Sequence, residues 1–254
     1  SMIGSAIFIV AADMGRTVGG PGWMIMLWII AGVMTIFAAL SYGELASMYP
    51  KAGGQYVYLK EAYNPLVGFL YGWSLFAVVQ TGTIAAVGVA FAKYTRQLFP
   101  MFSEKNILLT VGSFNLTAAQ LLGIASIFVL TFLNSKGISY GKFILRVFTS
   151  TKLIALFGLI ILGLFIFRDA EVWNANLAHF WDFGKYGTDE AGAGTFTTLT
   201  TFGLASAIGV GLVGSLFSAD AWNNVTFIAG EIENPKRSIP RSLFFGTVIV
   251  FALY

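Results

Sequence analysis

Uncharged stretches of the chain alternate with short charged segments. Charged residues are absent over 17–43, 62–92, 106–135 and 191–219, and also between Lys152 and Arg168, where the apolar pattern reaches back to Phe143. About 20 apolar residues cross a bilayer core as a helix, so each stretch is long enough for one crossing. Only helices and closed β-barrels pair all their backbone N–H and C=O groups in lipid. The runs lack the alternation of apolar and polar residues that barrel strands show, so helices are expected. The pattern predicts membrane-spanning helices near residues 22–46, 66–92, 117–134, 143–167 and 199–231.

The two ends of the chain carry shorter apolar segments. A helix over residues 3–16 or 240–254 is too short to cross a bilayer core at about 1.5 Å per residue. We therefore expect one transmembrane domain over residues 1–254, which starts in the second half of a first helix and stops inside a seventh. Pro65 and Pro240 are expected in the first turns of their helices, where the missing N–H costs little.

The composition supports a polytopic membrane protein. Charged residues make up 11% of the 254 residues, against about 25% in soluble domains. The net charge of +3 is too small for a nucleic-acid-binding patch. The chain has no cysteine, which excludes disulfides and cysteine-based metal sites within it. We expect no metal and no cofactor.

The basic residues indicate the orientation in the membrane. Nine Lys and Arg fall on one side of the predicted crossings and six on the other, and the side with more is expected in the cytoplasm. The loop over residues 168–198 belongs to the other side, and we expect it to be polar and external. The cytoplasmic set comprises Lys51, Lys60, Lys136, Lys142, Arg146, Lys152, Lys236, Arg237 and Arg241.

Two segments rich in small and polar residues interrupt the apolar pattern. Gly4-Ser5-Ala6 lies in the first predicted helix, and residues 214–220 end in the acidic Asp220. A helix in lipid gives up backbone hydrogen bonds only where it lines a cavity, and inverted-repeat transporters break the first helix of each repeat. Free N–H groups at such breaks bind a carboxylate, and free C=O groups bind an ammonium. The segments thus predict a site for a zwitterion, although close helix packing through small residues gives the same pattern.

Motifs along the whole chain resemble those of one family. Residues 4–8 are similar to G-S-G-I-F, with Ala6 in place of the second glycine, and residues 42–58 fit Y-x-E-L followed by P-x-S/A-G-G-x-Y-x-Y. Residues 217–223 resemble the break of a sixth helix, and residues 231–240 fit E-x-x-N-P-x-K/R-x-I-P. The chain resembles permeases of the amino acid–polyamine–organocation family, nearest the branch with the L-type amino acid transporters. The resemblance implies an all-α polytopic membrane protein with a LeuT-type inverted-repeat fold, truncated so that it runs from the second half of helix 1 to part of helix 7.

The resemblance also implies roles for residues at the two breaks. The substrate carboxylate would bind the backbone around Gly4, Ser5 and Ala6, and its ammonium would bind carbonyl groups. Phe217 would be an aromatic gate, although core packing or contact with lipid is the ordinary role of a Phe. The carbonyl groups implied for the ammonium belong to Ile3, Phe217, Ser218 and Ala219.

Asp220 and Lys152 are charged residues within predicted helices. Asp220 would cost about 3 kcal/mol on insertion scales unless it is paired or hydrated. It could bind a substrate amine, pair with Lys152, take up a proton, or cap the second half of the broken helix. Lys152 could simply extend to the interface. The resemblance instead implies that its ammonium replaces the cation of sodium-driven relatives, and release of its proton would couple transport to a proton gradient.

Three further polar residues, Gln80, Thr81 and Thr83, lie in an apolar helix. They either hydrogen-bond helices together or line the pocket. An intramembrane enzyme would need a nucleophile with a base or a metal cluster, and the sole histidine, His179, lies in the external loop. A channel would need a polar stripe or a repeated filter loop, and neither is visible.

The sequence therefore predicts secondary active transport of amino acids across the plasma (inner) membrane, by proton coupling or by exchange, in a multi-pass protein that is not an enzyme. A polyamine or cationic organic-amine transporter is the alternative, because Asp220 would suit a cationic substrate. We expect an amino acid, protons and the lipid bilayer as partners, and no nucleic acid. The pattern does not indicate an oligomeric state.

Overall fold

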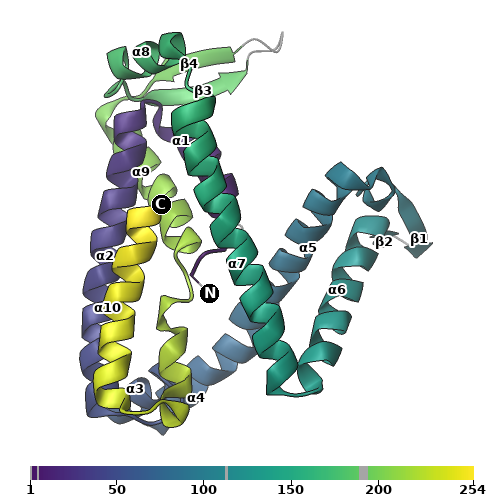
Figure 1. The fold of residues 1–254 in the computed structure, drawn as a ribbon, viewed down its shortest axis with the longest axis vertical. Coiled ribbons are helices and arrows are strands. Elements are labelled where there is room, and N and C mark those ends of the chain that lie inside the picture. Colours follow the sequence, from purple (N-terminus) through teal and green to yellow (C-terminus); the bar gives the residue numbers. More distant parts are fainter. Residues whose placement is uncertain (1, 5, 112–113, 189–193) are drawn as a thin grey trace. The chain divides into compact units, whose positions relative to one another are not determined.

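The computed structural model of the chain describes residues 2–4, 6–111, 114–188 and 194–254 and is mostly helical (Figure 1). Two compact units form: one comprises Ser1–Tyr58 with Thr149–Tyr254, and the other comprises Leu59–Phe148. Five helical segments within the described residues are long and apolar enough to cross a membrane. They are Pro21–Met48, Pro65–Leu98, Ala118–Ser135, Gly141–Ile166 and Thr201–Glu231.

Two helix pairs build the first unit. Its long helix α2 (Pro21–Met48) lies alongside α10 (Pro235–Leu253), and α1 (Ile7–Val18) packs against α9 (Thr201–Ser218) (Figure 1). Glycines stand where the backbones approach most closely. A Cβ on Gly43 would lie 3.2 Å from Cα of Pro240, and one on Gly214 would lie 2.6 Å from Cγ1 of Val10. Small residues allow this approach, which is how helices gain contact in lipid.

Pro240 lies inside α10, so the expectation of a first-turn proline there is wrong. The helix begins five residues earlier, at Pro235, after Asn234 in the left-handed conformation with a φ of 53°. A proline within a helix leaves the carbonyl group four residues before it without an N–H donor. Ser47 of α2 offers a donor, because its hydroxyl lies 3.0 Å from the Lys236 carbonyl oxygen, although its one proton is shared with the Gly43 carbonyl of α2 at 3.0 Å. Pro240 is therefore tolerated because α2 completes the hydrogen bonding of α10.

The loop over residues 168–198 has more regular structure than we expected. It contains a short helix, α8 (Ala170–Ala178), and an antiparallel hairpin of β3 (Gly184–Thr188) and β4 (Gly194–Thr198). The segment between them is bonded to the start of α2. The Gly20 N–H donates to the Asp182 carbonyl at 2.7 Å, and the Trp23 indole donates to the Trp181 carbonyl at 2.8 Å. The hydrophobic pattern missed this structure because its strands are short and solvent-exposed.

The second unit contains the pair α5 (Thr81–Leu98) and α6 (Ala118–Ser135). Gly88 and Gly123 face each other, since a Cβ on Gly123 would lie 3.1 Å from the Gly88 carbonyl oxygen. Asn64 caps α4 (Pro65–Ser74) by accepting from the Val67 N–H at 3.0 Å. The remaining elements of this unit are η1 (Leu75–Gln80, a π-helix), η2 (Pro100–Phe102), β1 (Ile107–Val111) and β2 (Phe114–Thr117).

The helices α3 (Gln55–Ala62) and α7 (Ile138–Ile161) each belong partly to both units. The π-helix η3 (Leu162–Ile166) continues α7 in the first unit. Single turns of π-helix within α-helices are frequent at functional sites. Two of the described crossings contain such a turn, η1 and η3.

Gly20 gives a direct test of the packing between α2 and the segment that joins α8 to β3. A Cβ on this residue would lie 2.6 Å from the Phe180 carbonyl oxygen and 2.7 Å from that of Asp182. Because backbone atoms cannot move aside cheaply, Gly20→Ala should lower the free energy of unfolding by about 1–3 kcal/mol. The thermal midpoint of the detergent-solubilised protein at a fixed scan rate measures this loss.

Gly158→Ala is the matched control, since a Cβ there meets nothing within 4 Å. In a helix interior this change should be neutral or stabilising by about 0.5–1 kcal/mol. An unchanged midpoint for Gly20→Ala would show that the segment joining α8 to β3 does not contact α2 as described.

Candidate functional site

The break in the last described crossing lies at residues 219–221. The helix α9 ends at Ser218, and the chain resumes as the 3-10 helix η4 (Trp222–Glu231). Gly214 and Ser215, which we had included in the interruption, remain helical. Gly214 instead makes room for Val10 of α1. Close packing, the alternative weighed for these small residues, therefore accounts for Gly214, while the break itself is formed further along.

Ala221 gives the break its strain. Its φ of 68° and ψ of 11° place it in the left-handed region. A residue with a Cβ pays about 1–2 kcal/mol for this conformation, and such residues cluster at functional sites. The turn before it is closed by the Asp220 N–H, which donates to the Phe217 carbonyl at 3.2 Å. The chain changes direction here without glycine, which is why the break was hard to locate from composition.

The segment before α1 differs from this turn. Residues 2–4 have no regular structure, and α1 begins at Ile7 with Ala6 as its cap. Ala6 has a φ of −61° and a ψ of −37°, which any residue adopts, so alanine in place of the family's glycine creates no strain. The Ala6 carbonyl accepts from the Val10 N–H at 2.8 Å. Ser5 lies outside the described residues, while Ile3 and Gly4 are half-buried.

The hydroxyl of Tyr254 bonds to the segment before α1 and to the end of α9. Its hydroxyl lies 3.2 Å from the Met2 carbonyl oxygen and 3.1 Å from the Ser218 carbonyl oxygen. One hydroxyl thus contacts the segment before α1 and the last residue of α9, which are distant in sequence. Sequence reasoning missed this residue, because a tyrosine in an apolar helix carries no signal of its partner.

The predicted charged residues have few partners. Asp220 is exposed and neither caps η4 nor forms a hydrogen bond or ion pair through its side chain with any described residue. The pairing of Asp220 with Lys152 that we considered is therefore not formed. Lys152 is a half-buried residue of α7.

Phe217, the predicted gate, is 56% exposed on α9. Ser218 and Ala219 beside it are buried, and the Ser218 hydroxyl donates to the Gly214 carbonyl at 3.0 Å. The hydroxyl of Ser218 is thus used within α9, which leaves its backbone carbonyl as the group that faces Tyr254.

Gln80, Thr81 and Thr83 belong to the second unit, around the end of η1. The Thr81 hydroxyl donates to the Ala77 carbonyl at 2.7 Å, and the Thr83 hydroxyl donates to the Val79 carbonyl at 2.8 Å. Both threonines therefore bond within their own helical segment. Neither shows the bond to another helix that we had considered.

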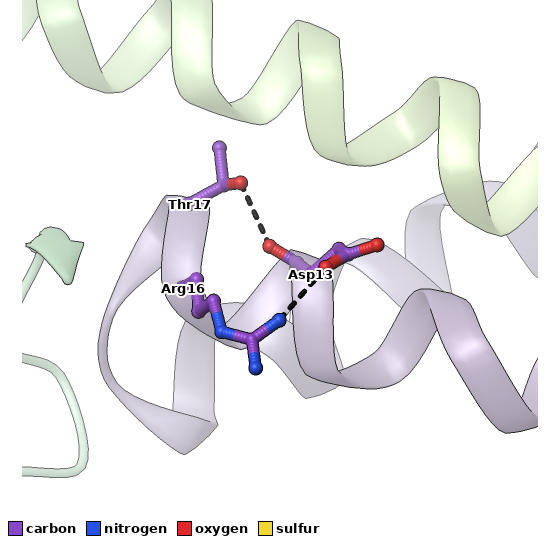
Figure 2. A network of polar contacts seen from close by, with 3 residues as sticks. All are labelled: Asp13, Arg16 and Thr17. Carbon is purple, nitrogen blue, oxygen red and sulfur yellow. Dashed lines mark hydrogen bonds and ion pairs between the residues drawn. The ribbon is translucent and has the colours of Figure 1, made fainter. Parts of the chain in front are cut away.

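An ion pair on α1 was not predicted (Figure 2). The Arg16 guanidinium lies 2.9 Å from the Asp13 carboxylate, and the Thr17 hydroxyl donates to the Asp13 carbonyl at 2.8 Å (Figure 2). The side chains of the pair are 66% and 68% exposed. An exposed pair of this kind contributes little to stability. No group of three metal-ligating side chains occurs among the residues that the structure describes.

A polar and aromatic cluster joins the loop before α3 to η4. The Gly53 N–H donates to the Phe227 carbonyl at 3.1 Å, and Gly54 has a φ of 48° and leaves no room for a Cβ beside Thr226. The Gln55 amide donates to the Tyr42 hydroxyl at 2.6 Å. The glycine pair in the motif over residues 42–58 is thus explained by contact with the segment directly after the break.

Tyr58 lies within this cluster with its ring edge against Tyr42, at 5.9 Å between centroids. Burial raises the pKa of Tyr58 above its ordinary value, because the phenolate would lose its hydration. The phenol of Tyr58 is therefore neutral. The cluster holds η4 against the loop before α3.

Comparison with known proteins decides the family. The family model described as amino acid permease matches residues 1–254. The chain belongs to the amino acid permease family. It is 27% identical to the b(0,+)-type amino acid transporter 1 of Oryctolagus cuniculus over 254 residues, which is 100% of this chain and 46% of the relative.

Two other relatives extend this picture. The permease is 29% identical to the Asc-type amino acid transporter 1 of Mus musculus over 257 residues, covering 100% of the chain and 43% of the relative. It is 26% identical to the serine/threonine exchanger SteT of Bacillus subtilis over 254 residues, covering 100% and 50%. The chain thus spans about half the length of these curated relatives. All are named as transporters or exchangers rather than enzymes, and with five candidate crossings among the described residues the permease is a multi-pass membrane protein.

The backbone of Ala221 can be tested by substitution in the permease. Ala221→Gly should raise the free energy of unfolding by about 1 kcal/mol, because glycine adopts a positive φ without a clash. Ala221→Val should lower it by about 1–3 kcal/mol, because β-branched residues are outliers there. Thermal midpoints in detergent measure both changes, and a valine variant as stable as the native protein would contradict the strained turn.

Proposed function

We propose that this permease carries out secondary active transport of amino acids across the plasma membrane. The observation that carries the proposal is the turn at residues 219–221 after α9 together with the irregular residues 2–4 before α1, because Tyr254 bonds to Met2 in that segment and to Ser218 at the end of α9. The proposal is supported by the family match and by the relatives, which are named amino acid transporters and exchangers. The LeuT-type inverted-repeat fold is part of the same proposal, because such folds break the first helix of each repeat.

The polarity of the two helix ends suits an amino acid backbone. The N-terminus of α1 presents N–H groups and a positive helix end, so the substrate carboxylate binds around Gly4, Ser5 and Ala6. The C-terminus of α9 presents carbonyl groups, and together with Ile3 these bind the ammonium. The carbonyls of α9 concerned are those of Phe217, Ser218 and Ala219.

Phe217 acts as the gate over the bound substrate in this proposal. Its ring is 56% exposed, whereas Ser218 beside it is 2% exposed. The ring therefore lies at the surface of the unit, next to the carbonyl groups that would bind the ammonium.

Exchange is favoured as the mode of transport by one relative, which is named a serine/threonine exchanger. Lys152 then acts as a fixed positive charge in place of a cation. If transport is coupled to protons instead, Lys152 releases and regains its proton.

Transport of a cationic amine is the second candidate. It is favoured by Asp220, whose exposed carboxylate has no ion-pair partner among the described residues. An unpaired carboxylate next to the break would bind a second ammonium group of the substrate. Polyamines and basic amino acids carry such a group, whereas serine and threonine do not.

Transport by the whole protein that carries this chain, purified into liposomes, tests the proposal. We expect saturable uptake of neutral amino acids that depends on amino acid inside the vesicles. Uptake only under an inward proton gradient would establish proton coupling instead of exchange. Selective uptake of polyamines would favour the second candidate, and folded protein that transports neither class would overturn both.

A substitution at Lys152 that keeps the positive charge but cannot release a proton distinguishes exchange from proton-coupled transport. Lys152→Arg should retain exchange and lose proton-driven accumulation, because arginine does not release its proton. Lys152→Met should reduce uptake more than about tenfold in either mode, because the site loses its positive charge. Uptake by each variant, normalised to folded protein, gives the comparison.

Lys142→Met is the matched control, because Lys142 lies on the same helix and is exposed. Its uptake should stay close to that of the native protein. Full activity of Lys152→Met would remove Lys152 from the proposed coupling mechanism.

A further inference from the structure

We propose that the connection between α5 and α6 is a binding surface for anionic phospholipid, with apolar side chains among the acyl chains of the adjacent leaflet and basic side chains on the headgroups. The connection comprises residues 99–117 and lies within the second unit (Figure 1). It joins two of the described crossings, so it stands at a boundary of the bilayer. The inference goes beyond the proposed function, because it holds whatever the permease transports.

Large apolar side chains are exposed from the end of α5 into this connection. Six of them are between 49% and 79% exposed, whereas a loop in water would present mainly polar side chains. Exposed apolar patches mark sites of interaction with a membrane or a protein. The six residues are Leu98, Phe99, Met101, Ile107, Leu108 and Leu109.

The hairpin of β1 and β2 has an apolar and a polar face. Leu109 is paired with Leu116, and the next pair, Thr110 with Asn115, lies on the opposite face because side chains alternate along a strand. The Thr110 hydroxyl donates to the side-chain oxygen of Asn115 at 2.9 Å, which satisfies the polar face internally. Amphipathic helices lie in the plane of a bilayer interface with the apolar face toward the acyl chains. The same division of faces favours this orientation for the hairpin.

Hydrogen bonds hold the connection in one conformation. The side-chain amide of Asn106 donates to the Met101 carbonyl at 3.0 Å, and the Asn106 carbonyl accepts from the Ala118 N–H at 2.9 Å. Thr117 starts α6 with a capping box, in which its hydroxyl accepts from the Gln120 N–H at 3.3 Å. The apolar side chains thus belong to a structured surface, which loses little conformational entropy when it binds a ligand.

The basic residues at this end of the unit match a negatively charged headgroup. Lys93 and Arg96 are three residues apart in α5, so their side chains are neighbours on the helix surface and repel each other. Neither they nor Lys105 forms an ion pair within the part of the chain that the structure describes. Glu104 is the only acidic residue of the sequence between 62 and 168. An anionic phospholipid brings net negative charge directly beside acyl chains, so it matches both the charge and the apolar surface.

Probes on the two faces of the hairpin test its orientation. In the whole protein, with any other cysteine replaced, Leu109→Cys and Thr110→Cys carry the same fluorophore in vesicles of phosphatidylcholine and phosphatidylglycerol. Dibrominated acyl chains should quench the probe at 109 about twofold or more above the probe at 110, and aqueous iodide should show the reverse preference. The position at 110 is the matched control, because it is the next residue on the opposite face. Both positions are exposed, so the labels do not disturb a packed core.

Selectivity between lipids tests the basic residues. The measured quantity is the affinity for a fluorescent phosphatidylglycerol relative to that for a fluorescent phosphatidylcholine. Each basic residue at a headgroup contributes about fivefold, so Lys93→Gln combined with Arg96→Gln should lower this ratio about tenfold to thirtyfold. Lys185→Gln removes one charge from the exposed strand β3 of the first unit and should leave the ratio within about twofold.

The possible outcomes are separate from those of the transport assay. Iodide quenching of both probes would place the apolar face in water and overturn the proposal. Protection of the probe at 109 from both quenchers would show that another segment of the protein or a second copy covers this face, which would also overturn it. An unchanged lipid ratio in the double variant would overturn the binding of an anionic headgroup. Neither measurement requires transport, so a failed uptake assay leaves this inference standing.

Discussion

Backbone N–H and C=O groups inside a bilayer must find partners within the protein, because lipid supplies none. This requirement explains the irregular features of the permease better than any preference of its residues. Pro240 within α10 is accepted because Ser47 of another helix donates to the carbonyl group that proline leaves open. The carbonyl group at the end of α9 is served by Tyr254 in the same way. In both cases a side chain from outside the helix completes what the helix cannot.

Small residues supply the close contacts on which these bonds depend. Gly43 lets α2 approach Pro240, and Gly214 lets α9 approach Val10 of α1. Lipid tails are as apolar as leucine, so burial of apolar surface drives helices together only weakly in a membrane. Short backbone separations then give van der Waals contact and bring donors such as Ser47 within reach of an acceptor. The packing and the polar bonding are therefore parts of one arrangement.

The spacing of charged residues predicted where the crossings lie, because inserting a charged residue into lipid costs free energy and this cost depends on the local sequence alone. It could not predict Pro240 within a helix, since that depends on a serine almost 200 residues away in the chain. The turn at residues 219–221 was placed only approximately, because it uses alanine in a left-handed conformation where composition suggested glycine. The contacts of Tyr254 were beyond reach for the same reason as those of Ser47. Both join segments whose proximity only the tertiary structure reveals.

The bond between Ser47 and Lys236 also bears on how the permease is made. A chain that emerges from its N-terminus inserts α2 well before α10. The carbonyl of Lys236 therefore meets its donor already in place when α10 packs against α2. In the reverse order of synthesis, that carbonyl group would lack the Ser47 donor until α2 followed. Ser47 precedes Pro240 in the chain, so the donor is synthesised before the carbonyl group that needs it.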